Sequence, residues 1–452
     1  MKAARSHPSS IDRPLGSAEN LYWLLDKLYC LNFVVFAEVD GRLESDRLAA
    51  ALATVQFENP LLRARIARVG ARRWFKAVAP ALAPLRPQVF KLTGWRREVE
   101  RQLQLPFDTG NAPLARWLWF KGSGRKSVFA MVFHHAIADG RSGATVLLDV
   151  LRRAAAAAEF EARHKPAQPS SQDLDLIRGQ SPLRSALKQT SFWLARGKAA
   201  LQPAQQLPGY DPNPAELRRV RTLAFQLDPP VLSGLQSQAR EHGTTVHGAI
   251  GAAQLMAISE QFPDARPRRL ALTSLADLRG ALAGGLTDSD LGLYIATLCT
   301  VHTLPPKPQF WTLAREIRDG LAATLDAGEG NLIHGVYPAS LALPWDGNAA
   351  RWIQAMVSAA PASSMLTNIG RIDPIDLGES LKLRSVAFVV APPAQHPVCI
   401  TAASYDGRMF VNLVYDELKL SAVRAGEIGN ALMGRLREAA LCAPPRGRAH
   451  AP

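Results

Sequence analysis

An apolar run, SVFAMVF, covers residues 127–133 and ends directly in two adjacent histidines, His134 and His135. A strand that is apolar at nearly every position must be covered on both faces, so the run predicts a sheet lying between other layers. The segment that follows, SGATVLLDVLRRAAAAAEFEA from Ser142, predicts a long helix with Ser142 as its N-cap. The histidines are therefore expected at a strand end, where a rigid element can hold side chains for chemistry.

The two histidines are not expected to share one task, because neighbouring residues of a strand point to opposite faces. One ring can face a cleft while the other packs behind it, which argues against a metal site built from both. Neither H-E-x-x-H nor G-x-S-x-G occurs in the sequence, so a zinc-binding helix and a serine nucleophile elbow are not indicated. What remains is one positioned histidine acting as a general base, because the ordinary histidine pKa lies close to physiological pH.

Asp139 and Gly140 follow the histidines in the turn that leads to the predicted helix. Gly140 is expected to supply the backbone freedom for this turn. The Asp139 carboxylate is suited either to orient an imidazole or to bind an arginine from the other lobe. We favour the arginine, since an aspartate at such a turn usually has a structural role.

The pattern along the chain predicts two lobes. The 452 residues suffice for two units with a core each. Helix-like and strand-like segments alternate in the first and last parts, whereas residues 166–215 are Pro-rich and polar around one predicted helix at 183–201. We therefore predict lobes at residues 1–165 and 216–452, joined by a crossover at 166–215. Neither G-x-G-x-x-G nor G-x-x-x-x-G-K-[ST] occurs, which argues against a βαβ nucleotide-binding fold.

The absence of recognisable targeting signals and the spacing of the cysteines predict a cytoplasmic protein. The polar N-terminus resembles no secretory signal, and no segment reaches the roughly 18 apolar residues of a membrane span. The four cysteines, at positions 30, 299, 399 and 442, lack the C-x-x-C spacing of a metal site. No transmembrane segment, disulfide framework or bound metal is expected.

The formal net charge of +14 includes a basic stretch from Arg63 to Arg97. A basic surface suits phosphate-bearing partners such as nucleic acid, coenzyme A or an acidic carrier protein. A general excess of solvated arginine is an equal alternative. No nucleic-acid-binding motif accompanies the charge, so no nucleic-acid partner is predicted.

The sequence HHAIADG at residues 134–140 resembles the H-H-x-x-x-D-G signature of the condensation domains and acyltransferases related to chloramphenicol acetyltransferase. MLTNIGRID is similar to a segment of stand-alone members, such as the polyketide-associated acyltransferases. The D-F-G-W-G segment of plant alcohol acyltransferases is absent, which argues against that branch. Further segments resemble the family in the same order along the chain: NPLLRARI, LPFDTGNAPLARWLWF, TTVHGAIGAAQLMAI and LADLRGAL.

The resemblance implies an α/β fold of the α+β type, in which two chloramphenicol-acetyltransferase-like lobes with mixed sheets form a V-shaped pseudo-dimer. It implies a stand-alone, monomeric acyltransferase of natural-product or lipid biosynthesis. The donor would be a thioester of coenzyme A or of a phosphopantetheinyl carrier protein, and the acceptor an alcohol or an amine, with no bound cofactor. The alternative is an inactive relative that only binds acyl groups or a carrier protein, although the intact motif speaks against it.

Carried over residue by residue, the resemblance makes His135 the general base, with His134 in support and no covalent acyl-enzyme. Asp139 would pair with Arg279 and hold the motif loop, although Arg268 and Arg269 are near in sequence. Gly140 would keep a substrate tunnel open beside the histidine.

Four more residues are candidates for the site. Thr367 stands where stand-alone members often have serine, and stabilisation of an oxyanion by Thr367 or Asn368 is a hypothesis. A strand end fixed by an asparagine turn is an equal alternative. His334 and His396 are interpreted as residues of solvent-exposed loops, with the acceptor pocket as the alternative.

Overall fold

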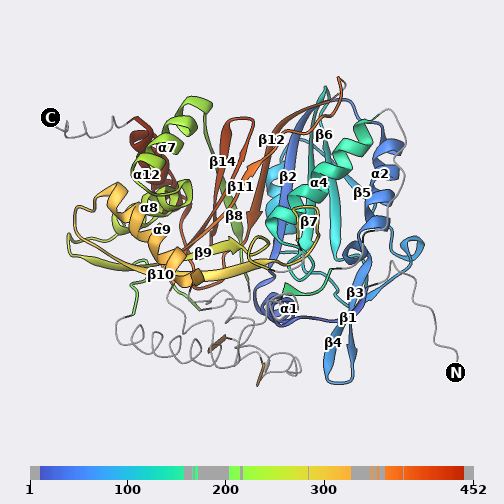
Figure 1. Ribbon diagram of the computed structural model, residues 1–452, viewed down its shortest axis with the longest axis horizontal. Coiled ribbons are helices and arrows are strands. Elements are labelled where there is room, and N and C mark those ends of the chain that lie inside the picture. The colour runs from blue at the N-terminus through green and yellow to red at the C-terminus, as the bar shows by residue number, and fades with distance from the viewer. Residues whose placement is uncertain are drawn as a thin grey trace.

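The computed structural model describes residues 11–156, 165, 168–171, 203–213, 217–282, 285–326, 348–349, 354–355, 362–379 and 381–441. Their helices and strands form two lobes that lie side by side (Figure 1). Two large sheets contain both parallel and antiparallel neighbours. The predicted α/β fold of two lobes with mixed sheets is thus confirmed. The helix predicted at 183–201, His334 and Cys442 lie outside the described residues.

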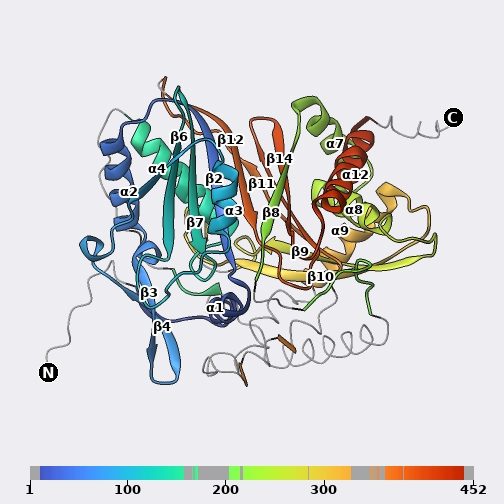
Figure 2. The same cartoon turned by 180° about the vertical axis from the view of Figure 1, so that it is seen from behind.

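A five-stranded sheet forms the centre of the first lobe, in the order β12-β2-β7-β6-β5. Helix α4 packs on one face of this sheet with α2 beside it, and α3 lies on the other face (Figure 2). β6 and β7 form an antiparallel hairpin. The bounds are β2 (Asn32–Gly41), β5 (Pro87–Lys91), β6 (Ala115–Lys121), β7 (Lys126–His134), β12 (Leu381–Val390), α2 (Ser45–Glu58), α3 (Trp95–Gln102) and α4 (Gly140–Ala155).

The two-sided cover of β7 accounts for its composition. Every residue from Val128 to His134 is buried, as the apolar run predicts. Phe33 and Val35 of the neighbouring β2 face α4, whereas Phe36, one residue further, contacts Trp95 of α3. This alternation follows from the period of two along a strand, and it places the sheet between two helical layers.

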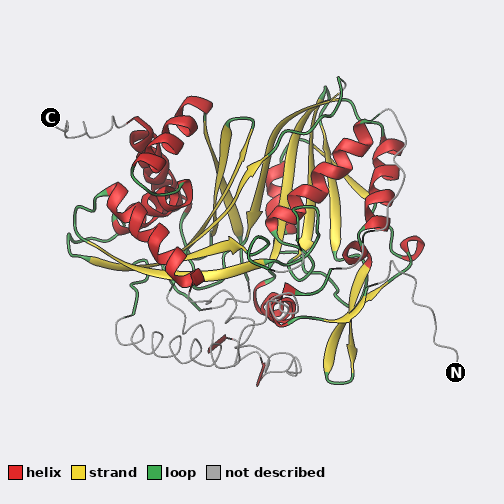
Figure 3. Ribbon diagram, viewed as in Figure 1, coloured by secondary structure: helices red, strands yellow, loops and turns green. Residues whose placement is uncertain are grey.

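A six-stranded sheet forms the second lobe, in the order β10-β9-β11-β13-β14-β8. Helices α7, α8, α9 and α12 cover its outer face (Figure 3). The strand bounds are β8 (Val220–Leu227), β9 (Arg268–Asp277), β10 (Ile295–Leu304), β11 (Ser364–Ile372), β13 (Val398–Tyr405) and β14 (Arg408–Asp416). The helix bounds are α7 (Pro229–Glu241), α8 (Val246–Ser259), α9 (Phe310–Asp326) and α12 (Ala422–Leu441).

Strand β12 belongs to the C-terminal half of the sequence but hydrogen-bonds within the first lobe. It runs antiparallel to β2, from the pair Leu381↔Gly41 to the pair Val390↔Phe33. The next strand, β13, returns to the sheet of the second lobe. The chain therefore returns to the first lobe for β12 alone and then re-enters the second lobe, and the core of the first lobe includes Phe388 of β12.

A small antiparallel sheet at the base of the first lobe has the order β1-β4-β3. Its bounds and those of the neighbouring helices are β1 (Asp12–Pro14), β3 (Ala64–Val69), β4 (Arg72–Ala77), α1 (Ser17–Tyr29) and the 3-10 helices η1 (Pro60–Arg63) and η2 (Pro80–Leu82). Two arginines of the basic stretch from Arg63 to Arg97 make contacts within the protein here. Arg63 is buried and bonds to backbone carbonyls, and Arg73 lies 4.0 Å from the centre of the Trp23 ring.

In the part of the chain that the structure describes, no helix is long and apolar enough to span a bilayer.

Candidate active site

The motif HHAIADG forms the turn between β7 and α4. Asp139 is the N-cap of α4: its Oδ1 accepts a hydrogen bond from the Ser142 backbone N–H at 2.9 Å. The Ser142 hydroxyl lies 3.3 Å from the Asp139 backbone N–H in return, which makes a capping box. The prediction of Ser142 as N-cap is therefore wrong. The helix begins earlier because the Asp139 carboxylate is already placed to accept the first free N–H groups.

The second carboxylate oxygen of Asp139 reaches the other lobe. Oδ2 accepts hydrogen bonds from Arg279 Nη2 at 2.9 Å and from the Tyr294 backbone N–H at 3.0 Å. Asp139 is completely buried and Arg279 nearly so. Arg268 instead pairs with Asp264. Of the two roles left open for Asp139, the structure shows the contact with an arginine of the other lobe, and this contact holds the turn that carries His135.

His135 is buried between two aromatic rings at the junction of the lobes. The ring centres of Tyr22 and Phe33 lie 4.6 Å and 4.9 Å from that of His135. Its Nδ1 lies 3.0 Å from the Ala138 carbonyl oxygen. Because a carbonyl only accepts, Nδ1 carries the proton and Nε2 keeps a lone pair. Burial lowers the pKa of His135 to about 4, so the ring is neutral at neutral pH.

His134 packs away from His135 and contacts other residues. Its Nδ1 accepts a hydrogen bond from the Ala136 backbone N–H at 3.1 Å, and its Nε2 lies 3.3 Å from Asp26 Oδ2. The other oxygen of Asp26 accepts from the Leu31 backbone N–H at 2.9 Å. His134 thus ties the end of β7 to the end of α1, which is consistent with a supporting role.

A cavity of about 150 Å³, here called the histidine cavity, lies between the lobes against His135. The first lobe contributes Phe33 and Gly140, and the second contributes Leu275 of β9 and Ile295 of β10. The cavity is therefore complete within one chain and is walled by both lobes.

Thr367 and Asn368 of β11 line the histidine cavity together with His135. The Asn368 Oδ1 accepts from the Gly370 backbone N–H at 2.9 Å, which is the asparagine turn that the sequence left as an alternative. β11 also shifts its register against β13 between Asn368 and Arg371. Such bulges often lie next to active sites, where they redirect side chains. The turn occupies Oδ1, so the amide nitrogen of Asn368 is the group left to donate toward the cavity.

Gly140 is needed for space rather than for backbone freedom. It is not among the glycines with positive φ, which corrects the expectation from the sequence. A Cβ on Gly140 would lie 3.0 Å from Ile369 Cγ2 and 3.4 Å from Phe388 Cε2, at the wall of the histidine cavity. Gly140 allows β11 and β12 to approach the first turn of α4 closely.

Sequence reasoning missed Arg141 and Tyr22. Arg141 follows the motif directly; its Nε donates to Asp288 Oδ1 at 2.5 Å and its Nη1 to the Ile369 carbonyl at 2.9 Å, so it ties α4 to the second lobe. Its position after the motif glycine is the only signal in the sequence. Nothing in the sequence sets Tyr22 apart, because a tyrosine in the segment LYWLLDKLY is typical of a packed helix.

His396 lies in the loop between β12 and β13 and is buried, so its interpretation as an exposed residue is wrong. Its Nε2 lies 2.9 Å from the Thr273 hydroxyl, and burial lowers its pKa to about 4. The loop is drawn inward because the Tyr210 hydroxyl donates to the carbonyls of Ala394 and His396, at 2.7 Å and 3.2 Å.

Residues 217–420 match the family model described as the phthiocerol/phthiodiolone dimycocerosyl transferase C-terminus. A linear gramicidin synthase of Brevibacillus parabrevis is 30% identical over 158 residues, which cover 34% of this chain and 3% of that protein. Chondramide synthase of Chondromyces crocatus is 27% identical over 257 residues, covering 52% and 6%. The chain thus spans only a few per cent of the length of these curated relatives.

Solved structures show the same fold at low sequence identity. Polyketide synthase associated protein 5 of Mycobacterium tuberculosis has a TM-score of 0.70 and 15% identity, covering 96% of this chain and 99% of that one. Trichothecene 15-O-acetyltransferase of Fusarium sporotrichioides has a TM-score of 0.74 and 11% identity, covering 97% of each chain. The starter condensation domain of rhizomide synthetase, solved with C8-CoA and Leu-SNAC, has a TM-score of 0.68 and 16% identity, covering 96% and 95%. The resemblance inferred from the motif is confirmed: residues 217–420 match a model of this acyltransferase family, and the chain has the fold of the condensation domains and acyltransferases.

Proposed function

We propose that the protein transfers an acyl group from a thioester to an alcohol or an amine, with His135 as the general base. One observation carries the proposal: a buried, neutral histidine with a free Nε2 lone pair lies at the wall of a cavity between the lobes. The family match at residues 217–420 and the C8-CoA bound to a condensation domain of the same fold support a thioester donor.

In the proposed reaction, Nε2 of His135 takes the proton from the acceptor hydroxyl or amine as its oxygen or nitrogen attacks the thioester carbonyl carbon. The tetrahedral intermediate collapses when the carbon–sulfur bond breaks, and the departing sulfur takes the proton back from the imidazolium. No acyl-enzyme forms, because the acceptor itself is the nucleophile. The positive charge on His135 exists only while an oxyanion is present nearby, and this opposite charge favours the protonated ring.

The oxyanion would be stabilised from β11. The Asn368 amide nitrogen and the Thr367 hydroxyl are uncharged donors that β11 contributes to the lining of the histidine cavity. Hydrogen-bond donors fixed before the reaction stabilise the developing charge without further reorganisation. We therefore assign Asn368 and Thr367 to this role.

Either coenzyme A or a phosphopantetheinyl carrier protein can present the thioester, and the protein would act as a monomer, since one chain supplies both walls of the histidine cavity. Cys30 and Cys399 carry free thiols, which fits the cytoplasmic location proposed here.

The test is thiol release from a panel of acyl-coenzyme A thioesters and acylated carriers of different chain lengths, with mixed alcohols and amines as acceptors. Wild type is compared with His135→Ala and with the matched control His302→Ala. His302 is also buried, and burial lowers its pKa to about 4, but it does not line the histidine cavity.

Loss of a general base should lower turnover by about 10²–10⁴-fold in His135→Ala. His302→Ala should keep turnover near that of wild type at equal folded concentration. If no donor releases thiol, or release is unchanged in His135→Ala, the proposal fails. Tight binding of acyl groups without release would then favour the inactive, binding-only alternative.

A further inference from the structure

The basic part of the sequence forms a surface that the histidine cavity does not use. Residues 59–97 contain ten basic side chains and no aspartate or glutamate. Half of these basic residues lie within residues 64–77, which form β3, β4 and the turn between them. This hairpin extends from the base of the first lobe, beyond α1, in both views of the ribbon (Figure 1, Figure 2). We call it the arginine hairpin.

One face of the arginine hairpin is held against the protein. Ile66 and Phe75 pair across its two strands and are buried. Arg73 lies on the same face as Phe75, because residues two apart in a strand share a face. The Arg73 guanidinium lies over the Trp23 ring of α1, 4.0 Å from the ring centre, and its Nη1 donates to Asn20 Oδ1 at 2.9 Å. These contacts fix the hairpin against α1.

The other face of the hairpin, here called the outer face, combines cationic with apolar side chains. Alternation along the two strands places six residues on it: Arg65, Ala67, Val69, Arg72, Trp74 and Lys76. Arg65 and Arg72 are exposed, and Val69 is 43% exposed. Trp74 is half-buried, with the Lys76 Nζ 5.0 Å from the centre of its ring. The outer face is therefore amphipathic and open to a partner.

Little of the positive charge on the outer face is neutralised within the protein. Lys76 pairs with Asp12 at 2.6 Å. Arg65 and Arg72 form no ion pair with any residue that the structure describes. The formal net charge of +14 means that the rest of the protein does not compensate for them. The outer face thus favours an anionic partner.

The composition of the arginine hairpin favours a lipid surface over other anions. Residues 64–77, ARIARVGARRWFKA, contain no asparagine, glutamine, serine or threonine. Proteins that read nucleic-acid bases use such amide and hydroxyl side chains beside arginine. A membrane interface instead accepts cationic side chains together with tryptophan and aliphatic ones, because lipid phosphates lie directly above the acyl layer. Val69, exposed beside the turn, gains apolar contact only in such a layer.

We propose that the outer face docks the protein on a membrane surface rich in anionic lipids. Arg65 and Arg72 lie at the level of the lipid phosphates, and Val69 and Trp74 contact the upper part of the acyl layer. The arginines are attracted by the negative surface potential, and the two apolar side chains add buried area. No residue of the histidine cavity takes part, so the inference does not depend on the proposed function.

Co-sedimentation with vesicles tests the docking. Vesicles of phosphatidylcholine alone are compared with vesicles of phosphatidylcholine and phosphatidylglycerol in about a two-to-one ratio, which carry a negative surface potential. The variant is Arg65→Ala/Arg72→Ala. The matched control is Arg125→Ala/Lys126→Ala, which also removes two exposed basic side chains from a hairpin, the one formed by β6 and β7. The turn of that hairpin lies at the other end of the first lobe (Figure 1).

Wild type should bind the mixed vesicles and not phosphatidylcholine alone. Arg65→Ala/Arg72→Ala should weaken this binding by about thirtyfold, as expected for two basic side chains at an anionic surface. The control should stay within about threefold of wild type, because salt screens distant charges. Equal melting temperatures show that the variants are folded. Equal losses in the two variants would indicate attraction by net charge alone and would overturn the inference, as would failure of wild type to bind the mixed vesicles.

Two further measurements separate a lipid surface from another anion. The chain has nine tryptophans, so the emission of wild type is compared with that of Trp74→Phe. Mixed vesicles should shift the emission of wild type to shorter wavelength, and this shift should be largely absent in Trp74→Phe. An equal shift in both proteins would contradict the docking. Titration with a single-stranded polynucleotide completes the test: a loss of affinity in Arg65→Ala/Arg72→Ala for the polynucleotide but not for the vesicles would identify a nucleic-acid surface and overturn the proposal.

Discussion

Asp139 and Arg279 stand 140 residues apart in the sequence and meet in a buried ion pair, with 2.9 Å between Asp139 Oδ2 and Arg279 Nη2. Asp139 caps α4 in the first lobe, and Arg279 follows β9 in the second. One carboxylate therefore begins the helix and links the two lobes at once. The turn that carries His135 is therefore fixed by an arginine of the second lobe, and His135 and Arg279 both line the histidine cavity.

Replacing Asp139 with alanine should lower the free energy of unfolding by about 3–5 kcal/mol, because Arg279 would remain buried without its main partner. Asp139→Asn should also destabilise, although asparagine keeps the N-cap. Urea denaturation followed by circular dichroism measures both. The control is Asp373→Ala, which removes an ion pair with Arg371 at 3.1 Å whose side chains are 80% and 82% exposed and which should cost about 0–1 kcal/mol. Equal losses at the two sites would contradict the argument.

Acyl transfer should show little dependence on pH near neutrality. A general base must be unprotonated, and burial lowers the pKa of His135 from 6.5 to about 4. The rate constant kcat/KM, which reports the free enzyme, should therefore stay level between pH 8 and pH 6 and fall only as the pH approaches about 4. Short assays at each pH separate this profile from unfolding. A midpoint near pH 6.5 would mean that the histidine is solvated in the working enzyme.

The folded state should lose stability in acid at a higher pH than carboxylate protonation alone would cause. Burial lowers the pKa of four histidines to about 4 (His135, His247, His302 and His396). Below pH 6.5 these histidines bind protons in the unfolded chain but stay neutral in the folded state. The free energy of unfolding is therefore level above about pH 6.5 and falls as the pH drops toward 4.

Each of these histidines should lower the free energy of unfolding by about 1.4 kcal/mol for each pH unit of acidification within that window. Denaturation midpoints measured at pH 7.5, 6 and 5 give the slope for wild type. The variant His302→Gln should show a weaker dependence of the free energy of unfolding on pH, smaller by the contribution of one histidine, since glutamine does not titrate. An unchanged midpoint between pH 7.5 and pH 5 would show that the rings are hydrated in the folded protein.

Gly143 lies in α4 against the rings next to the candidate base. A Cβ at Gly143 would lie 2.9 Å from Phe33 Cε2 and 3.0 Å from Phe133 Cε2. Gly143→Ala should therefore destabilise the fold by about 1–3 kcal/mol through overpacking and should lower kcat, because Phe33 contacts His135. Gly426→Ala in α12 is the control, since no atom lies within 4 Å of its added Cβ, and it should be neutral or stabilising. Thermal melts and thiol release distinguish the two variants.

Local patterns made part of this structure predictable. The apolar run before His134 predicted a strand buried on both faces, and the motif led to the contact between Asp139 and Arg279. The asparagine turn at Asn368 was one of two stated alternatives. In each case residues close in sequence, or a known spacing, carry the information.

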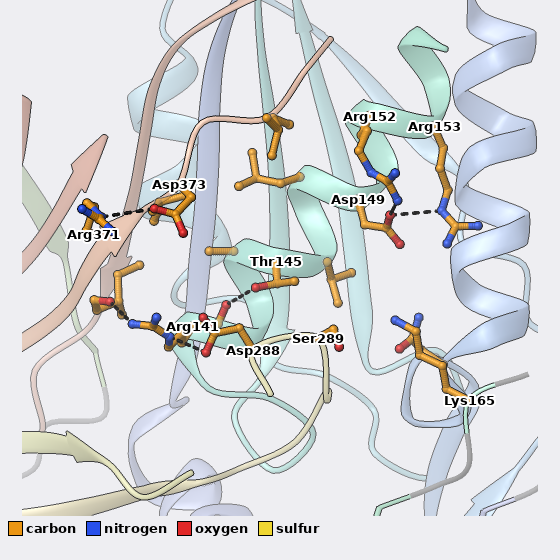
Figure 4. A pocket seen from close by; sticks show the side chains of 17 residues that line it. Arg141, Thr145, Asp149, Arg152, Arg153, Lys165, Asp288, Ser289, Arg371 and Asp373 are labelled. Atoms are coloured by element: carbon orange, nitrogen blue, oxygen red, sulfur yellow. Dashed lines mark hydrogen bonds and ion pairs between the residues drawn. The ribbon is translucent and has the colours of Figure 1, made fainter. Parts of the chain in front are cut away.

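The errors arose where distant segments decide the outcome. The loop of His396 is rich in proline and resembles an exposed turn, but the Tyr210 hydroxyl binds its carbonyls from 184 and 186 residues away. Arg152 of α4 and Ile372 of β11 line one cavity (Figure 4) although they lie on elements that are far apart in the chain. Gly140 suggested a flexible turn because the strand that approaches it, β11, comes more than 200 residues later.

The position of β12 beside β2 has a consequence for synthesis of the protein. Chains tend to fold from the N-terminus as they leave the ribosome. Here one edge of β2 can pair with β7, but β12, the partner of its other edge, is not complete until residue 390 has been made. For most of translation this second edge of β2 therefore presents an open row of backbone donors and acceptors, the kind of edge at which nascent chains pair wrongly.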